Sequence, residues 1–233
     1  MTDRSGLQPL MTKKVSRESE VAIFTPEQFR KLLADGISDA TDRLFFAAYL
    51  ATGARGREFS RFTGSPEWYS VTQKSIHMPE FKLERRKQTF DRWIKLSDWG
   101  VKMIGKMLYV LPTMPEKVYT HVDVGEAVKD GDGNTTGRGR TEIVIRHKWY
   151  NEDQIYHRLR YYTRRAGMDE TYVGKKTMRI TWASWLAATM PDKSQLIILS
   201  QGDSYKTFLH HYLASPFPRE QREEIIPFVK GWG

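Results

Sequence analysis

The segment 39–53, DATDRLFFAAYLATG, constrains the fold of this chain more than any other stretch of the sequence. Its apolar residues fall on nearly every side of a helix, a pattern typical of a helix that is buried rather than lying on a surface. Gly53 is the expected C-cap, because glycine readily takes the left-handed conformation in which many helices end. Other elements of the chain must therefore cover this helix.

Helical patterns precede and follow this segment, with strand patterns between them. Thr25, Pro26 and Gln28 form a helix start, with an N-cap, a proline at the first helical position and a capping-box residue. The stretches 68–80 and 89–97 read as strands joined by a basic turn, which predicts a β-hairpin or a small three-stranded sheet. Further elements are expected as helices at 54–63, 97–111, 153–168 and 176–190 and as a short strand at 142–150. This order predicts a mainly α fold with a small antiparallel β-sheet, of the α+β class.

The sequence divides into a short tail and one domain. Residues 1–22 are polar and lack the apolar core of a signal peptide, so we expect a disordered tail. The domain occupies residues 23–233. Within it, 125–140 is Gly-rich without apolar periodicity, which predicts a flexible loop or insertion. A terminal helix that starts at a proline is expected at about 218–232.

The charge of the chain favours a polyanionic partner. It has 37 Lys and Arg residues against 28 Asp and Glu, a net charge of +9, which points most simply to nucleic acid. The absence of cysteine excludes disulfides, thiolate zinc sites and cysteine nucleophiles, and fits a reducing intracellular environment. No stretch reaches the roughly 20 apolar residues that a membrane span needs. The acidic residues show no metal-ligand spacing, which disfavours a two-metal nuclease.

Basic residues stand at positions suited to a phosphate. Arg55 directly follows the buried helix, and Arg179 lies at the start of a helix, where backbone N–H groups also favour anions. Two arginines can clamp the non-bridging oxygens of one phosphate, since each guanidinium is a planar fork of donors. A lysine on the basic turn can protonate a leaving oxygen, and a tyrosine hydroxyl can attack phosphorus to form a covalent ester. The turn holds four basic residues: Lys82, Arg85, Arg86 and Lys87.

Three short motifs carry such residues in a recognisable order. The first, ATGARGREFSRF, contains Arg55 and, three residues later, Glu58, and the second is the KxxR at 176–179. The third places Tyr212 nine residues after Asp203, which follows a glycine. Together the motifs resemble those of the tyrosine recombinase (integrase) family. The similarity is greatest to integrases of archaeal viruses and plasmids, in which lysine also replaces the first histidine.

The resemblance implies a site-specific DNA recombinase that cleaves and rejoins strands through a 3′-phosphotyrosyl intermediate, with the catalytic-domain fold of that family. The resemblance implies that Tyr212 is the nucleophile and that Arg55 and Arg179 contact the phosphate. It implies Lys87 as the proton donor, with Lys82 as the alternative. Lys176 takes the place of the family's histidine, and Glu58 has a supporting role. No metal or other cofactor is implied. The implied partners are double-stranded DNA with an attachment site and further copies of the chain.

Two features depart from the family pattern. Asp203 stands where a histidine, tryptophan or arginine would assist phosphate binding, and a carboxylate repels a phosphate. Either Asp203 points away and Lys206, His210 or His211 substitutes for it, or the activity is reduced. The family usually carries an N-terminal helical domain, whereas only a short polar stretch precedes residue 25, so a catalytic domain alone is expected.

Several alternatives stay open. Tyr205 rivals Tyr212 as the nucleophile, and the run at 156–165 is equally a DNA-facing surface and a helix that is half core and half solvated arginines. A type IB topoisomerase-like enzyme and a DNA-binding protein with a decayed recombinase site are the alternative functions. The residues expected to contact DNA are Arg85, Arg86, Arg158, Arg160, Arg164 and Arg165.

Overall fold

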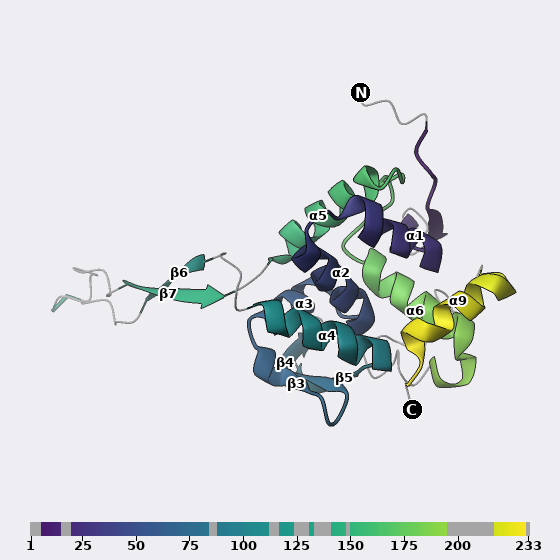
Figure 1. Ribbon diagram of the computed structural model, residues 1–233. Helices are drawn as coiled ribbons and strands as arrows, with labels where there is room; N and C mark the ends of the chain where they lie inside the picture. Colours follow the sequence, from purple (N-terminus) through teal and green to yellow (C-terminus); the bar gives the residue numbers. More distant parts are fainter. Residues whose placement is uncertain are drawn as a thin grey trace.

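The structure, a computed structural model, describes residues 6–14, 20–83, 88–111, 117–123, 131–132, 141–147, 150–194 and 217–231. Within these ranges helices predominate, and small antiparallel sheets accompany them (Figure 1). The helices are α1 (Pro26–Lys31) with the π-helical turn Leu32–Gly36, α2 (Ala40–Thr52), α3 (Gly56–Thr63), α4 (Asp98–Val110), α5 (Glu152–Arg165), α6 (Thr177–Thr189) and α9 (Arg219–Val229). The expected mainly α fold with a small antiparallel sheet is confirmed.

Helix α2 is the buried helix that the sequence predicts. Every residue from Phe45 to Thr52 is buried, and α4 and α6 pack against the helix. The helix ends at Gly53 with a φ of 58°. A Cβ on Gly53 would come within 2.3 Å of the Trp182 ring of α6. Glycine is therefore required here by the backbone conformation and by the close approach of α6.

A three-stranded antiparallel sheet follows α3. Its strands are β3 (Tyr69–Ser70), β4 (Ser75–Leu83) and β5 (Gln88–Lys95), in that order, with a register shift on β4 between Met78 and Phe81. On β5 and just beyond it, Arg92, Ile94 and Leu96 are buried, whereas Trp93 and Lys95 are exposed. This alternation turns one face of β5 towards the core, and an arginine lies on that face.

The N-terminal residues differ from the expected disordered tail. Of the stretch 1–22, the structure describes residues 6–14 and 20–22, and these are ordered by backbone hydrogen bonds. Strand β1 (Met11–Lys14) pairs with β2 (Glu20–Ile23). The Gln8 N–H donates to the Gly167 carbonyl, and the Asp169 N–H donates to the Gln8 carbonyl, both at 2.8 Å. The bonds of Gln8 have partners about 160 positions away in the chain, so no local sequence pattern indicates them.

Two further segments bear on the predictions. A hairpin of β6 (Lys117–Asp123) and β7 (Thr141–His147) extends away from the helical body (Figure 1). Of the expected loop 125–140, only residues 131–132 are described, and they form a turn. The helix expected at about 218–232 is observed as α9, which packs on α6 and α4. No helix in the described part of the chain has both the length and the apolar character to cross a membrane.

Candidate active site

The junction between α2 and α3 positions Arg55. After Gly53 the chain turns, and Arg55 becomes the N-cap of α3. Its backbone N–H donates to Glu58 Oε2 at 2.9 Å, and its Nη1 donates to Glu58 Oε1 at 2.8 Å. Glu58 is thus the third residue of a capping box and also orients the arginine side chain. The Arg55 side chain remains 36% exposed, so it is held in place and still reaches solvent.

Arg92 joins this pair from the sheet. Its Nη2 donates to Glu58 Oε2 at 2.6 Å, and both side chains are only 6% exposed. The sequence analysis did not assign Arg92 to the site. The signal that could have found it is the alternation along β5, which puts a charged residue in register with buried apolar ones. A buried arginine needs an acidic partner, and Glu58 provides one.

Arg179 reaches the same place from the first turn of α6. Its Nη1 donates to the Gly53 carbonyl at 2.7 Å, and the residue is 4% exposed. Arg179 also lies close enough to Glu58 and Arg92 to lower the pKa of each. The carbonyl at the end of α2 is an acceptor at the negative end of the helix dipole, which suits a cation. The structure therefore brings Arg55, Glu58 and Arg179 together, as well as Arg92.

The electrostatics of this cluster favour an anion. Burial alone would raise the pKa of Glu58, but Arg92, Arg55 and Arg179 outweigh it and hold that pKa below its usual range. Burial lowers the pKa of Arg92, and Glu58 opposes that shift. Arginine stays protonated in proteins, so three guanidinium groups surround one carboxylate and these four side chains sum to two positive charges. A phosphate diester or a sulfate would complement that excess.

A tyrosine lies beside the cluster but is unsuited to attack a phosphate. Tyr49 of α2 stacks on Phe59, with ring centroids 4.9 Å apart, and is 2% exposed. Burial raises the pKa of its hydroxyl well above the ordinary value, and Glu152 and Glu58 raise it further. A buried phenol with a raised pKa does not provide a phenolate. Tyr49 is therefore assigned to packing against Phe59.

Lys176 lies at the same end of α6 as Arg179. It is the N-cap residue of the helix, one turn before Arg179, and its side chain is exposed. The neighbouring Lys175 is committed to an ion pair, with its Nζ 2.6 Å from Asp153 Oδ1. Of the two lysines, Lys176 is the one in the KxxR motif, and its role beside a phosphate stays a prediction.

Helix α5 carries four of the arginines predicted to contact DNA. Arg158 lies 4.2 Å from the centre of the Tyr150 ring, and its Nη1 is 3.3 Å from Asp42 Oδ2. Asp42 is buried and accepts hydrogen bonds from the hydroxyls of Tyr150 and Tyr162. Burial and the hydrogen bond to Asp42 raise the pKa of Tyr162 to about 12. Arg158 therefore contributes to a network that fixes α5 on α2.

The other three arginines of α5 differ from one another. Arg160 is partly buried and donates to the Tyr156 hydroxyl at 3.3 Å. Arg164 and Arg165 are exposed at the end of the helix, and Arg165 donates to Ser38 Oγ at 3.0 Å. The exposed pair is the better placed to meet a DNA backbone, which remains a prediction.

Much of the proposed chemistry falls on residues that the structure does not describe. Lys82 is described on β4 by its backbone, which is paired with Thr89 next to the turn. The sequence-predicted residues outside the described part are Arg85, Arg86, Lys87, Asp203, Tyr205, Lys206, His210, His211 and Tyr212. In the described ranges, no three His, Cys, Asp or Glu residues are grouped so that they could hold a metal ion.

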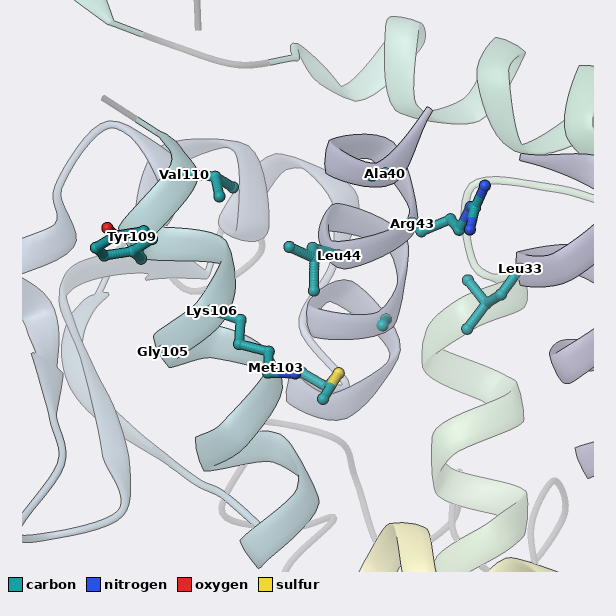
Figure 2. A pocket seen from close by; sticks show the side chains of 10 residues that line it. Leu33, Ala40, Arg43, Leu44, Met103, Gly105, Lys106, Tyr109 and Val110 are labelled. Atoms are coloured by element: carbon teal, nitrogen blue, oxygen red, sulfur yellow. The ribbon is translucent and has the colours of Figure 1, made fainter. Parts of the chain in front are cut away.

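A groove elsewhere on the molecule has a different character. It has a volume of about 620 Å³ and lies between α2 and α4 (Figure 2). Leu33, Leu44, Met103 and Val110 line it, and the guanidinium of Arg43 at its edge donates to the backbone carbonyls that follow the π-helical turn. The groove borders the N-terminal half of α2, whereas the arginine cluster lies at its C-terminal end. Its apolar lining does not suit a phosphate.

Comparisons with known proteins show the fold. No family model matches the chain, and no curated protein matches it. Among solved structures it is similar to XerA recombinase, with a TM-score of 0.52 and 15% identity over 92% of this chain and 65% of that one. It is also similar to the integrase from mycobacterium phage Brujita, with a TM-score of 0.49 and 14% identity over 95% of this chain and 60% of that one. The chain thus spans less than two thirds of each. Its fold is that of the recombinase and integrase catalytic domain.

Proposed function

We propose that the protein is a site-specific DNA recombinase of the integrase type, which cleaves and rejoins strands through a 3′-phosphotyrosyl intermediate. One observation carries the proposal: Arg55 and Arg179, from the α2–α3 junction and from α6, meet at one positively charged cluster. The two residues belong to separate sequence motifs and lie 124 positions apart in the chain. The recombinase fold and the net charge of +9 support the same function.

In the proposed reaction the arginines bind the scissile phosphate and stabilise the charge that builds on its non-bridging oxygens. The Tyr212 hydroxyl oxygen attacks phosphorus and its proton passes to solvent, so that a tyrosyl–phosphorus bond forms and the bond to the 5′ oxygen breaks. Lys87 gives a proton to that leaving oxygen, with Lys82 as the alternative donor. Lys176 supports the phosphate or assists proton transfer. Attack by a 5′ hydroxyl reverses the step and rejoins the DNA.

The proposal includes partners and a location. Double-stranded DNA with an attachment site is the substrate, and several copies of the chain assemble on it to exchange strands. The basic turn and the exposed arginines at the end of α5 contact the DNA backbone, whose phosphates attract them. Such a protein works inside the cell, on the host or element DNA. An origin in an archaeal virus or plasmid is the finer form of this proposal and rests on the resemblance of the C-terminal stretch from residue 210 and on the lysine of the KxxR motif.

A covalent-trapping experiment tests the function. The full chain is incubated, without metal, with nicked suicide duplexes whose central sequence is randomised, and the products are separated on a denaturing gel. We expect a protein–DNA adduct with the wild type, loss of the adduct in Tyr212→Phe, and a much weaker adduct in Arg179→Ala. Sequencing of the attached DNA would then identify the preferred site. Tyr205→Phe is the matched control and should keep the adduct.

Each other outcome of this experiment has a distinct meaning. Loss of the adduct in Tyr205→Phe instead of Tyr212→Phe would move the nucleophile to Tyr205. Adducts without sequence preference, together with relaxation of any supercoiled plasmid, would identify a topoisomerase-like enzyme. Salt-sensitive DNA binding without any adduct would indicate a DNA-binding protein with a decayed site, and Asp203 would be the first residue to replace.

A further inference from the structure

The way Glu58 divides its hydrogen bonds points to a role for Arg92. Oε1 accepts from the Arg55 side chain, while Oε2 accepts from Arg92 and from the Arg55 backbone. Arg92 and the backbone N–H of the helix cap thus hold Oε2 of Glu58. Because Oε2 is held, the position of Oε1, which orients the Arg55 side chain, is fixed as well.

The position of Arg92 is unusual for a core strand. A buried ion pair gives up strong hydration, and well-packed apolar residues of similar size are often as stable or more so. Ile94 and Leu96, which follow at alternate positions on the same face, are apolar as expected. An arginine at such a position therefore indicates a role beyond packing. Its ion pair with Glu58 indicates that this role concerns the arginine cluster.

We infer that Arg92 is a positioning residue. It anchors the Glu58 carboxylate and balances its charge, so that the positive charges of Arg55 and Arg179 stay available to the bound phosphate. This inference rests on the proposed function for the identity of the anion. Without Arg92, the same carboxylate would be balanced only by the two arginines that bind the anion. It would then compete with the phosphate for them.

This role predicts a specific dependence on pH when Arg92 is replaced. Among the described residues, the charged and titratable groups facing Glu58 are Arg55 at the α3 cap, Arg92 on β5, Arg179 on α6 and Tyr49 on α2. Loss of Arg92 removes the largest charge that keeps the pKa of Glu58 low, while the burial that raises that pKa remains. In Arg92→Met, acid therefore protonates Glu58, ends its competition and strengthens anion binding.

Sulfate titrations of the full chain test the inference without requiring DNA cleavage. Sulfate keeps its charge from about pH 5 to about pH 8, so a change of pH in this range alters only the charge of the protein. Arg92→Met should bind sulfate about tenfold more weakly than the wild type at neutral pH, and the ratio should approach one as the pH falls. Arg92→Met with Glu58→Gln leaves no carboxylate to titrate at this place, so its affinity relative to the wild type should show no such recovery as the pH falls. Lys95→Met, on the exposed face of the same strand, is the control and should match the wild type.

A constant ratio between Arg92→Met and the wild type at every pH would overturn the inference and leave Arg92 a packing residue. If Arg92→Met does not fold, the double variant decides, and a recovery of its sulfate affinity at low pH would overturn the inference, because Glu58 is absent from it. The trapping experiment separates this inference from the proposed function. Normal sulfate behaviour without a DNA adduct would remove the function alone, whereas an adduct with a constant ratio would remove the role of Arg92 alone.

Discussion

At the scale of single residues, one carboxylate connects folding with the candidate chemistry. Glu58 closes the first turn of α3, orients Arg55 and balances the buried charge of Arg92. Its burial would raise its pKa, and the three surrounding arginines reverse that shift. The local fold therefore depends on Glu58 being ionised, and this dependence can be measured.

Replacement of Glu58 by Gln should lower the free energy of unfolding by about 3 kcal/mol at neutral pH, because buried Arg92 loses its counter-charge. The pKa of Glu58 is lowered in the folded protein, so its carboxylate contributes stability above its unfolded pKa. That contribution is lost as the pH falls through the folded pKa. Urea unfolding of both proteins from about pH 7 to about pH 3 should show the difference shrinking. A difference that stays constant would contradict this account.

At the scale of elements, the end of α2 sets where the site forms. Gly53 has a φ of 58°, and the Trp182 ring of α6 occupies the space that a Cβ would need. Its carbonyl accepts the hydrogen bond from Arg179. The turn, the packing of α6 and the position of one predicted catalytic arginine therefore depend on a single glycine.

Gly53→Ala should destabilise the protein by about 2–4 kcal/mol, from the left-handed backbone and from overpacking against Trp182. Thermal or urea unfolding measures this loss. Gly105→Ala is the matched control, because Gly105 lies inside α4 with nothing within 4 Å of an added Cβ. The control should be more stable than the wild type by about 0.5–1 kcal/mol. Equal effects of the two changes on the free energy of unfolding would contradict both causes, the left-handed backbone and the contact with Trp182.

The elements that the sequence predicts well are those with signals inside a few residues. The capping box of Thr25 and Gln28 and the Gly53 end of α2 both lie where the sequence predicts them. Arg55 and Arg179 were also found locally, from motifs. The contact of Arg92 with Glu58 spans 34 positions and two element types, so no local pattern contained it. The bonds of Gln8 to Gly167 and Asp169 were missed for the same reason.

At the scale of the whole molecule, segments near both ends hold the helices together. The Ser97 hydroxyl donates to the Phe228 carbonyl at 2.7 Å, and the Phe228 ring packs on Trp99 and Trp185, with centroids 4.9 and 5.0 Å away. At the other end of the chain, Gln8 bonds to residues 167 and 169 just after α5. These contacts link α4, α5, α6 and α9 to distant parts of the sequence.

Removal of residues 1–14 should therefore reach beyond the removed segment. The Asp169 N–H donates to the Gln8 carbonyl, so this amide should exchange with solvent faster in the truncated protein. The free energy of unfolding should fall by about 2 kcal/mol, since β1 and its packing are lost. Hydrogen exchange and urea unfolding measure the two effects. Removal of residues 1–5 alone keeps Gln8 and should leave Asp169 protected; equal exchange in both truncations would contradict the assigned role of Gln8.

The arginine cluster also has a consequence for the time before folding is complete. Its members lie at positions 55, 58, 92 and 179, so a ribosome adds the last one 124 residues after the first. Even then they come together only when α6 docks on α2. A protein with the proposed activity would damage chromosomal DNA if it were active before its folding is complete. In the proposed reaction, nascent and misfolded copies lack the site altogether, and the ability to break DNA arises in the same event that completes the fold.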